Sequence, residues 1–333
     1  MTAGKKVILS GMRPTGKLHI GHYTGALENW VSLQNDYKNY HLIADYHALT
    51  TNLDTSEIFN NTIEMLIDWI ACGINPEESP VFRQSKIKEH TELFLIFSML
   101  ITKARLEKNP SLKEQIKDLN LESISYGHLG YPVLQASDIL LYKGEFVPVG
   151  EDQLPHIEIT RHIAGIFNQN YELEGGRKIF PIPAPKLTGF ARLPGLEGDA
   201  KMSKTLGNTI LISDNAETVK NKIKKAFTDP AKLRKGDKGH PEICRIFTYH
   251  KKFNPDETDE IYAGCTSGTL GCADCKMNIS LKIINFFSPV LEKRKELEKQ
   301  KGTILDILIE GEKKARNTAE TTMQEVRSAM KLG

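Results

Sequence analysis

Long apolar runs are missing from this sequence of 333 residues. Its longest apolar run, at residues 93–101, is far shorter than the roughly 20 residues that a membrane-spanning helix needs. The N-terminus also lacks the apolar core of a signal peptide. These absences, together with 40% apolar and 26% charged residues, predict a soluble globular protein of the cytoplasm with no membrane partner.

Cysteine is scarce as well, because the chain has only five. Cys72 stands alone within a helical pattern and is typical of a small core residue. The other four gather late in the chain, as Cys244, Cys265, Cys272 and Cys275. Four clustered cysteines in a reducing compartment indicate a metal site rather than disulfides, and their spacing alone is typical of zinc.

A strong excess of charge of either sign is missing, since the net charge is only +2. The charges are unevenly spread, however: residues 220–252 hold eleven Lys or Arg against three Asp or Glu. Such a basic stretch is either a surface that meets phosphates or a solvated helix face. Net charge by itself therefore leaves a nucleic-acid partner open.

Strand-like runs alternate with helical patterns in the first half of the chain. We predict strands at residues 5–11, 40–45, 81–85 and 145–149, with helices at 19–34, 54–73 and within 86–130 between them. Parallel strands need helical crossovers, so this order predicts an α/β fold with a doubly wound parallel sheet. Asp54 and Glu57 are expected to form the capping box of the second helix, and Pro132 is expected to open a further helix.

From about Asp214 onward strand runs are missing, and charged amphipathic helices follow one another. A chain of this length exceeds one typical domain. We therefore expect an α/β domain at 1–200 with a helical insertion at about 86–130. A loop and linker at 201–215 and an all-α domain at 216–333 follow it.

The first predicted strand leads through a glycine-bearing turn into His19-Ile20-Gly21-His22. The free N–H groups and the dipole at a helix start attract phosphate, and the two imidazoles can donate to it. Gly21 leaves room for a flat ligand against the backbone. Alone, this motif indicates either a nucleotide pocket or two surface histidines at a helix start.

A second motif, Lys201-Met202-Ser203-Lys204-Thr205, lies in a predicted loop between glycine and proline turns. Two lysines three positions apart suit the oxygens of a leaving pyrophosphate. In this order the two motifs resemble the "HIGH" and "KMSKS" signatures of class I aminoacyl-tRNA synthetases. The segments 131–142 and 147–158 resemble the bacterial tryptophanyl-tRNA synthetases in particular, with tyrosyl enzymes as the nearest relatives.

The resemblance implies a Rossmann-like catalytic domain that joins tryptophan to the 3′ end of its tRNA, using ATP with Mg²⁺. It assigns His19, His22, Lys201 and Lys204 to catalysis. It also implies that ATP is bound by Arg13, Pro14, Thr15, Gly21, His22, Gly150, Glu151, Asp152, Leu193, Lys201, Met202, Ser203, Lys204 and Thr205. Thr205 departs from the usual serine but keeps a hydroxyl, and Lys113 is a further candidate for the phosphates.

Asp138 stands among apolar residues of a predicted helix. It either points to water or is a buried carboxylate, which is costly without a partner. The resemblance implies the second arrangement, with Asp138 accepting the indole N–H of tryptophan. It also assigns His47, Tyr131, Gln135, Val147, Val149 and Gln153 to the tryptophan pocket. A site built around such a hydrogen bond rejects an analogue that lacks the donor by roughly 10⁴ to 10⁵.

Three further expectations come from the resemblance. A subset of these enzymes that shares the Cys-x6-Cys-x2-Cys run carries a 4Fe-4S cluster, which we favour over Zn²⁺ for Cys244, Cys265, Cys272 and Cys275. The insertion implies a homodimer, and the helical domain implies a place beside the tRNA anticodon.

Two other classes of protein compete with this interpretation. One is a small-molecule nucleotidyltransferase, which would not need residues 215–333. The other is a non-catalytic RNA-binding paralogue, which would not need two intact motifs.

Overall fold

The computed structural model describes residues 4–118, 123–187, 193–197, 202 and 207–332. These residues form two compact units. The first unit is built from the described residues of Met1–Gly16, Glu28–Gly189 and Gln300–Gly333, and the second from those of Lys17–Leu27 and Phe190–Lys299. The single helical domain expected at 216–333 is divided, because the last stretch of the chain, Gln300–Gly333, belongs with the α/β unit.

The first unit contains a parallel sheet of five strands in the order β3-β2-β1-β4-β5. The strands are β1 (Val7–Met12), β2 (Lys38–Ile43), β3 (Val81–Arg83), β4 (Phe146–Val149) and β5 (Ala184–Leu187). The predicted doubly wound parallel sheet is thus confirmed. The fifth strand was not predicted, because Pro183 and Pro185 interrupt its pattern; proline is tolerated there since β5 is an edge strand.

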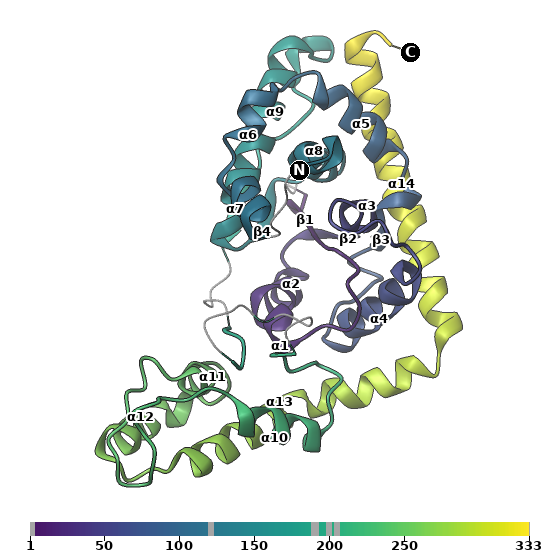
Figure 1. Ribbon diagram of the computed structural model, residues 1–333. Coiled ribbons are helices and arrows are strands. Elements are labelled where there is room, and N and C mark those ends of the chain that lie inside the picture. The colour runs from purple at the N-terminus through teal and green to yellow at the C-terminus, as the bar shows by residue number, and fades with distance from the viewer. Residues whose placement is uncertain (1–3, 119–122, 188–192, 198–201, 203–206, 333) are drawn as a thin grey trace. The chain divides into compact units, whose positions relative to one another are not determined.

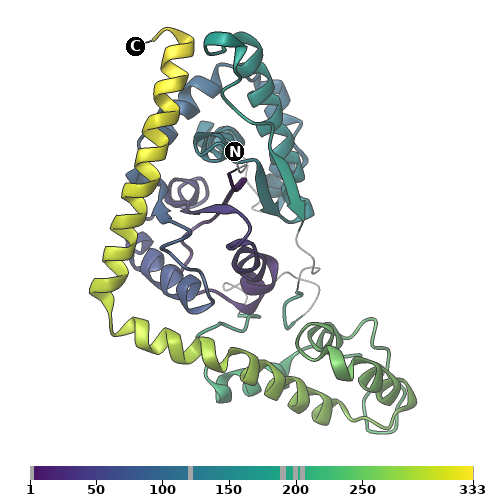
Figure 2. The ribbon, with the colours of Figure 1, turned by 180° about the vertical axis from the view of Figure 1, so that it is seen from behind.

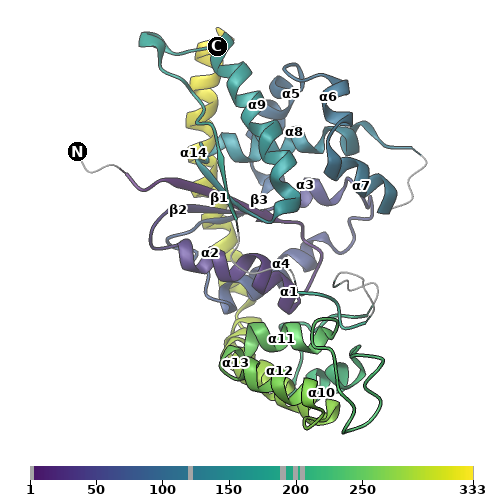
Figure 3. The same cartoon turned by 90° about the vertical axis from the view of Figure 1, so that its left-hand side faces the viewer.

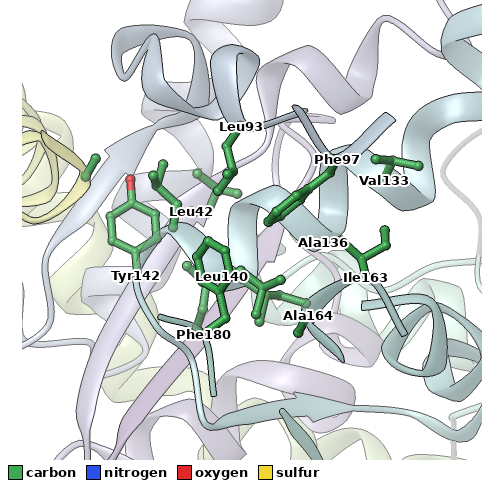
Figure 4. Close-up of a cluster of buried hydrophobic side chains, with 14 of the residues drawn as sticks. Leu42, Leu93, Phe97, Val133, Ala136, Leu140, Tyr142, Ile163, Ala164 and Phe180 are labelled. Atoms are coloured by element: carbon green, nitrogen blue, oxygen red, sulfur yellow. The ribbon is translucent and has the colours of Figure 1, made fainter. Parts of the chain in front are cut away.

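Helices cover both faces of this sheet (Figure 3). The helices α2 (Glu28–Leu33) and α4 (Ile58–Ala71) lie on one face, and α5 (Glu89–Ser98), α8 (Tyr126–Leu141) and α9 (Leu154–Asn170) lie on the other. Shorter helices, α3 (Asp45–Ala48), α6 (Lys103–Glu107) and α7 (Pro110–Asp118), complete the unit. The core beneath α8 joins Leu140 to Phe97 of α5 and Ile163 of α9 (Figure 4).

The long helix α14 (Lys301–Met330) explains why the end of the chain belongs to the first unit (Figure 2). It lies so close to β3 that a Cβ atom on Gly311 would stand 2.0 Å from the carbonyl oxygen of Val81. Arg83 also pairs with Glu312 at 2.5 Å, and the hydroxyls of Tyr40 and Thr318 are 2.9 Å apart. These contacts link distant segments, which helical periodicity alone does not reveal.

Three local predictions need correction. Pro132 lies inside α8, which instead begins at Tyr126 after Ser125, whose Oγ accepts the His128 N–H. No capping box forms at α4, because the Asp54 carboxylate accepts the Ser56 N–H in the preceding turn. The predicted helix 19–34 contains a π-helical turn at Tyr23–Leu27, which shifts the phase of its buried face.

The second unit is helical and contains α1 (Ile20–His22), the π turn, α10 (Ala216–Lys225), α11 (Arg245–Phe253), α12 (Thr258–Ser267) and α13 (Cys272–Glu298). The helices α10 and α11 pack on α13, and α12 packs on α11 (Figure 1). Tyr23 places its ring edge-on to Phe286 and Phe287 of α13. Across the described ranges, no helix combines the length and apolarity that crossing a membrane requires.

Candidate active site

The carboxyl ends of the parallel strands place polar side chains at one edge of the sheet. Asp45 follows β2, Gln84 follows β3, and Gly150 follows β4. From β1 the chain adds β2 and β3 toward one edge of the sheet, and from β4 it adds β5 toward the other edge. The switch point of the sheet therefore lies between β1 and β4. Ligands of doubly wound folds bind in the crevice outside the strand ends at such a point.

The residues after β1 line a cavity of about 360 Å³ within the first unit. Arg13, Pro14 and Thr15 form one wall, and Thr51 and Asn52 lie opposite. Arg13 is exposed and donates from Nη1 to the Thr51 hydroxyl at 3.4 Å. The three residues assigned to ATP after β1 therefore share one hollow surface.

Asp138 is buried, with 2% of its surface exposed, and it has partners from three elements. Its Oδ2 lies 2.9 Å from His47 Nε2, and its Oδ1 accepts a hydrogen bond of 2.7 Å from Gln84 Nε2. His90 Nδ1 makes a further electrostatic contact of 2.7 Å with Oδ1. The expectation that this carboxylate is buried with partners is confirmed.

These partners keep Asp138 ionised. Burial alone would raise the pKa of its carboxyl group, but the hydrogen bonds and charges of His47 and His90 outweigh burial and hold that pKa at about 2. A carboxylate has about four lone-pair positions; Oδ2 meets His47 alone, whereas Oδ1 meets the Gln84 donor and the close contact of His90. Oδ2 is therefore the oxygen with room for another donor.

Tyr131 lies on α8 seven residues before Asp138, two turns away on the same face of the helix, and is 8% exposed. Its ring meets that of His47 edge-on, with 6.3 Å between the centroids. Its hydroxyl lies 2.9 Å from His156 Nε2 and accepts a hydrogen bond of 3.1 Å from Gln115. Burial raises the pKa of Tyr131 to about 12, so the hydroxyl keeps its proton at neutral pH.

The remaining residues assigned to the pocket lie on β4, on α8 and in the turn after β4. Val147 and Val149 belong to β4 and are buried, and Gln135 is a half-buried residue of α8. After β4, Glu151 and Asp152 are exposed in a short 3₁₀ turn. Asp152 accepts a hydrogen bond from Gln153 at 2.9 Å, and a Cβ atom on Gly150 would stand 2.9 Å from Asp152 Oδ1, so a side chain at position 150 would require Asp152 to move.

The histidine motif lies in the second unit at the start of α1. The rings of His19 and His22 stack with centroids 3.7 Å apart. The His19 N–H donates to His22 Nδ1 at 3.2 Å, so the proton of a neutral His22 ring is on Nε2. The fold thus holds both imidazoles in a fixed arrangement.

The two signature motifs meet within the second unit. A Cβ atom on Gly21 would stand 3.0 Å from Met202 Sδ, so the methionine of the second motif packs on the glycine of the first. The chain after that motif pairs with the first, since Ile20 donates its N–H to Ile210 at 2.9 Å. Leu193 is buried nearby in the same unit. Lys201, Ser203, Lys204 and Thr205 lie outside the described residues.

The four late cysteines are free of disulfides and lie near one another in the second unit. Burial, together with the charges of Cys244, Cys265 and Cys272, raises the pKa of the Cys275 thiol to about 12. A Cβ atom on Gly239 would stand 2.6 Å from Cys265 Sγ. Among the described residues no three His, Cys, Asp or Glu side chains are arranged to hold a metal ion.

Sequence reasoning missed five residues that support the predicted ones. Gln84 and His90 surround Asp138, while Asn109, Gln115 and His156 support Tyr131. Gln84 carries a usable signal, because it directly follows a buried strand. The others are separated from their partners along the chain, and nothing in their local pattern marks them.

Comparisons with known proteins agree with this geometry. The family of class I tRNA synthetases for tryptophan and tyrosine matches residues 1–288. The tryptophan–tRNA ligase of Aquifex aeolicus is 42% identical over 98% of this chain and 99% of its own, and that of Thermotoga maritima is 45% identical with the same coverage. The crystal structure of tryptophanyl-tRNA synthetase from Campylobacter jejuni, complexed with ADP and tryptophan, superposes with a TM-score of 0.84 at 33% identity, covering 98% of this chain and 100% of that one.

The chain therefore belongs to the class I aminoacyl-tRNA synthetases for tryptophan and tyrosine, in agreement with its parallel sheet and its two signature motifs. Within that family it belongs with the tryptophan–tRNA ligases. Both competing classes, the small nucleotidyltransferase and the non-catalytic paralogue, are set aside by this full-length similarity.

Proposed function

We propose that the ligase reaction of this chain follows two steps. In the first, the tryptophan carboxylate attacks the α-phosphate of ATP bound with Mg²⁺, and pyrophosphate leaves. In the second, a ribose hydroxyl at the 3′ end of the tRNA for tryptophan takes the acyl group. The observation that supports tryptophan most directly is the buried, ionised Asp138, whose Oδ2 has room for the indole N–H.

Positioning and charge supply the catalysis in this scheme, and no side chain acts as a nucleophile. Val147, Val149 and Gln135 would enclose the indole, while His47, Tyr131 and Gln153 orient the amino acid. Asp152 would take a ribose hydroxyl beside Gly150 and Glu151. In the first unit, Arg13, Pro14 and Thr15 would contact the nucleotide. In the second unit the histidine motif, Leu193 and the 201–205 loop are assigned to it, and His22, with a proton on Nε2, would donate to a phosphate oxygen.

Exchange of labelled pyrophosphate into ATP tests this proposal, with each of the twenty amino acids supplied in turn. We expect exchange with tryptophan alone, at a rate at least about 10⁴ times that with phenylalanine or tyrosine. Charging of tRNA should then require the tRNA for tryptophan. Exchange that depends on tyrosine instead, or that needs no amino acid, would contradict the proposal.

We propose also that Cys244, Cys265, Cys272 and Cys275 hold a 4Fe-4S cluster. Four thiols that lie close enough to influence each other's ionisation, and that form no disulfide, match the four irons of a cubane. A cubane is larger than one ion, so its thiolates stand farther apart, and binding would require them to lose their protons.

Protein purified without oxygen should be brown and contain about four iron and four sulfide per chain. Replacing Cys272 by serine should remove the colour and weaken tRNA charging while sparing pyrophosphate exchange, because the cysteines belong to the second unit and Asp138 belongs to the first. Cys72→Ser is the matched control, since Cys72 ends α4 in the first unit and should leave the colour intact. Colourless protein with one equivalent of zinc would show that the cluster assignment is wrong.

Three further assignments are proposals of the same kind. A homodimer is supported by α5 and the residue after it, where Leu95 is 57% and Met99 is 74% exposed. Contact with tRNA through the helical domain at 216–333 is supported by the basic stretch at residues 220–252. A cytoplasmic location fits an enzyme whose partners are tRNA, tryptophan and ATP.

A further inference from the structure

Asp45 ties the end of β2 to the end of β3 at the edge of the sheet where the candidate site lies. Its Oδ1 accepts the N–H of Ser85 at 2.9 Å, and its Oδ2 accepts a hydrogen bond from the hydroxyl of the same serine. Oδ1 also accepts the N–H of Tyr46 at 3.1 Å. Asp45 is 7% exposed, so water has little access to these bonds. One side chain thus fixes the start of α3 against the 3₁₀ turn η2 (Gln84–Lys86), and we call these contacts the strand-end clamp.

The turn to which Asp45 binds is itself held in place by α14. Arg83, which directly precedes η2, pairs with Glu312 at 2.5 Å. Arg316 follows one helical turn later on α14 and donates to the carbonyl of Lys86, the last residue of η2, at 3.0 Å. The long helix therefore holds both ends of η2, and the strand-end clamp attaches α3 to a fixed point.

The strand-end clamp matters to the candidate site because α3 also carries His47, two residues after Asp45. His47 Nε2 lies 2.9 Å from Asp138 Oδ2, and since an ionised carboxylate can only accept, Nε2 must carry the proton of this bond. A carboxylate oxygen offers two lone pairs, and His47 uses one of those on Oδ2. The direction in which Oδ2 accepts a second donor therefore depends on where His47 lies, and the clamp fixes the helix that carries His47.

We propose that Asp45 and Ser85 are positioning residues for the selectivity toward tryptophan. The clamp holds His47 on one lone pair of Asp138 Oδ2, so that the other lone pair stays directed at the indole N–H. This inference rests on the proposed role of Asp138 as the acceptor of that N–H. A hydrogen bond separates tryptophan from phenylalanine only while its acceptor stays in place, and a displacement of about 1 Å can cost about 10² in rate.

Asp45→Ala removes the clamp and leaves every residue assigned to tryptophan or ATP unchanged. We expect the ratio of kcat/KM for tryptophan to that for phenylalanine in pyrophosphate exchange to fall roughly 10- to 100-fold, with the KM for ATP little changed. Asp45→Asn should keep most of this ratio, because its amide still accepts the Ser85 N–H and can donate to the serine hydroxyl.

Ser85→Ala is a milder variant that tests the clamp even where Asp45→Ala fails to fold, because the backbone bond to Asp45 remains. It should lower the ratio roughly two- to tenfold, as for the loss of one hydrogen bond, whereas Ser85→Thr keeps the hydroxyl and should keep the ratio. A ratio that stays at the wild-type value in both alanine variants would overturn the proposal.

A double-mutant cycle with Asp138→Ala separates this role from a structural one. In that background Asp45→Ala should lower the ratio no further, because its effect passes through the Asp138 carboxylate. Glu325→Gln is the matched control for lost stability, since Glu325 of α14 pairs with Lys143 and Arg177 instead. It should lower the melting temperature and leave the ratio unchanged. An Asp45→Ala effect that persists undiminished in Asp138→Ala, or an equal loss of selectivity in Glu325→Gln, would contradict the proposal.

NMR of protein labelled with ¹⁵N-histidine gives an answer that does not depend on activity, with the His47 signals assigned by their loss in His47→Gln. The wild type should show a proton on Nε2 that exchanges slowly with water, because it is bonded to Asp138. Asp45→Ala should make this proton exchange too fast to be seen, whereas Gln84→Met, which leaves the clamp intact, should preserve it. A His47 proton that is unchanged in Asp45→Ala would show that the clamp does not position this ring, whatever the kinetics. If the NMR result is as expected but Asp138→Ala leaves the tryptophan kinetics unchanged, the error lies in the proposed pocket, and the link to selectivity falls with it.

Discussion

Replacing Asp138 by alanine is expected to lower kcat/KM for tryptophan activation by about 10- to 150-fold, while the KM for ATP changes little. The substitution removes the charged acceptor proposed for the indole N–H, and hydrogen bonds to charged groups contribute roughly 1.5 to 3 kcal/mol. Discrimination against phenylalanine should fall as well, because phenylalanine has no donor and loses nothing. Pyrophosphate exchange, measured with both amino acids, checks the two expectations together.

The same substitution should also destabilise the fold, because Asp138 receives hydrogen bonds from His47 and Gln84 in addition to its contact with His90. Each buried donor left without an acceptor costs roughly 1 to 3 kcal/mol. Kinetics must therefore be recorded well below the melting temperature of the variant.

Gln84→Met is the matched control for stability. It removes a donor from Oδ1 but leaves Oδ2 free to accept the indole, so selectivity against phenylalanine should remain. Loss of selectivity in Gln84→Met together with unchanged tryptophan kinetics in Asp138→Ala would exclude Asp138 as the acceptor.

The sheet was largely predictable because its signals are local. The runs that became β1, β2, β3 and β4 each combine a few apolar residues with flanking turn signals, and the order of strands and helices follows from the need for crossovers. The strand β5 escaped prediction because Pro185 is acceptable only at a sheet edge, and edge position is a property of the finished sheet.

The candidate site was predictable where a single residue is energetically costly in its sequence surroundings. A carboxylate among apolar helix residues, such as Asp138, demands partners, but the sequence does not say which. Gln84 and His90 lie 54 and 48 positions earlier in the chain. His90 reaches Asp138 because α5 packs on α8, and Gln84 reaches it from the turn that follows β3. The placement of α14 depends in the same way on a long-range contact, since Gly311 has no side chain and lets the helix lie against β3. Long-range packing, which a single sequence does not encode in any one segment, decides both.

The lysines of the second motif, Lys201 and Lys204, should affect catalysis more than ATP binding. Each alanine variant is expected to reduce kcat of adenylate formation by about 10² to 10³, the usual effect of losing one group that stabilises developing charge. The leaving pyrophosphate gains charge as its bond to the α-phosphate breaks, so a nearby ammonium stabilises the transition state more than bound ATP. The rate of adenylate formation, measured in single turnovers at varied ATP concentration, separates the effect on the chemical step from the effect on ATP binding.

One contact of the structure agrees with the proposed action of this motif on the nucleotide. Met202 packs on Gly21 of the histidine motif within the second unit, while Lys201 and Lys204 lie outside the described residues. Lys220→Ala is the matched control, because it removes one exposed positive charge from α10 of the same unit without touching either motif. Its kcat should stay at the wild-type value. If the Lys201 and Lys204 variants merely raised the KM for ATP at constant kcat, the two ammonium groups would bind the ground state and the transition state equally, and the catalytic assignment would be wrong.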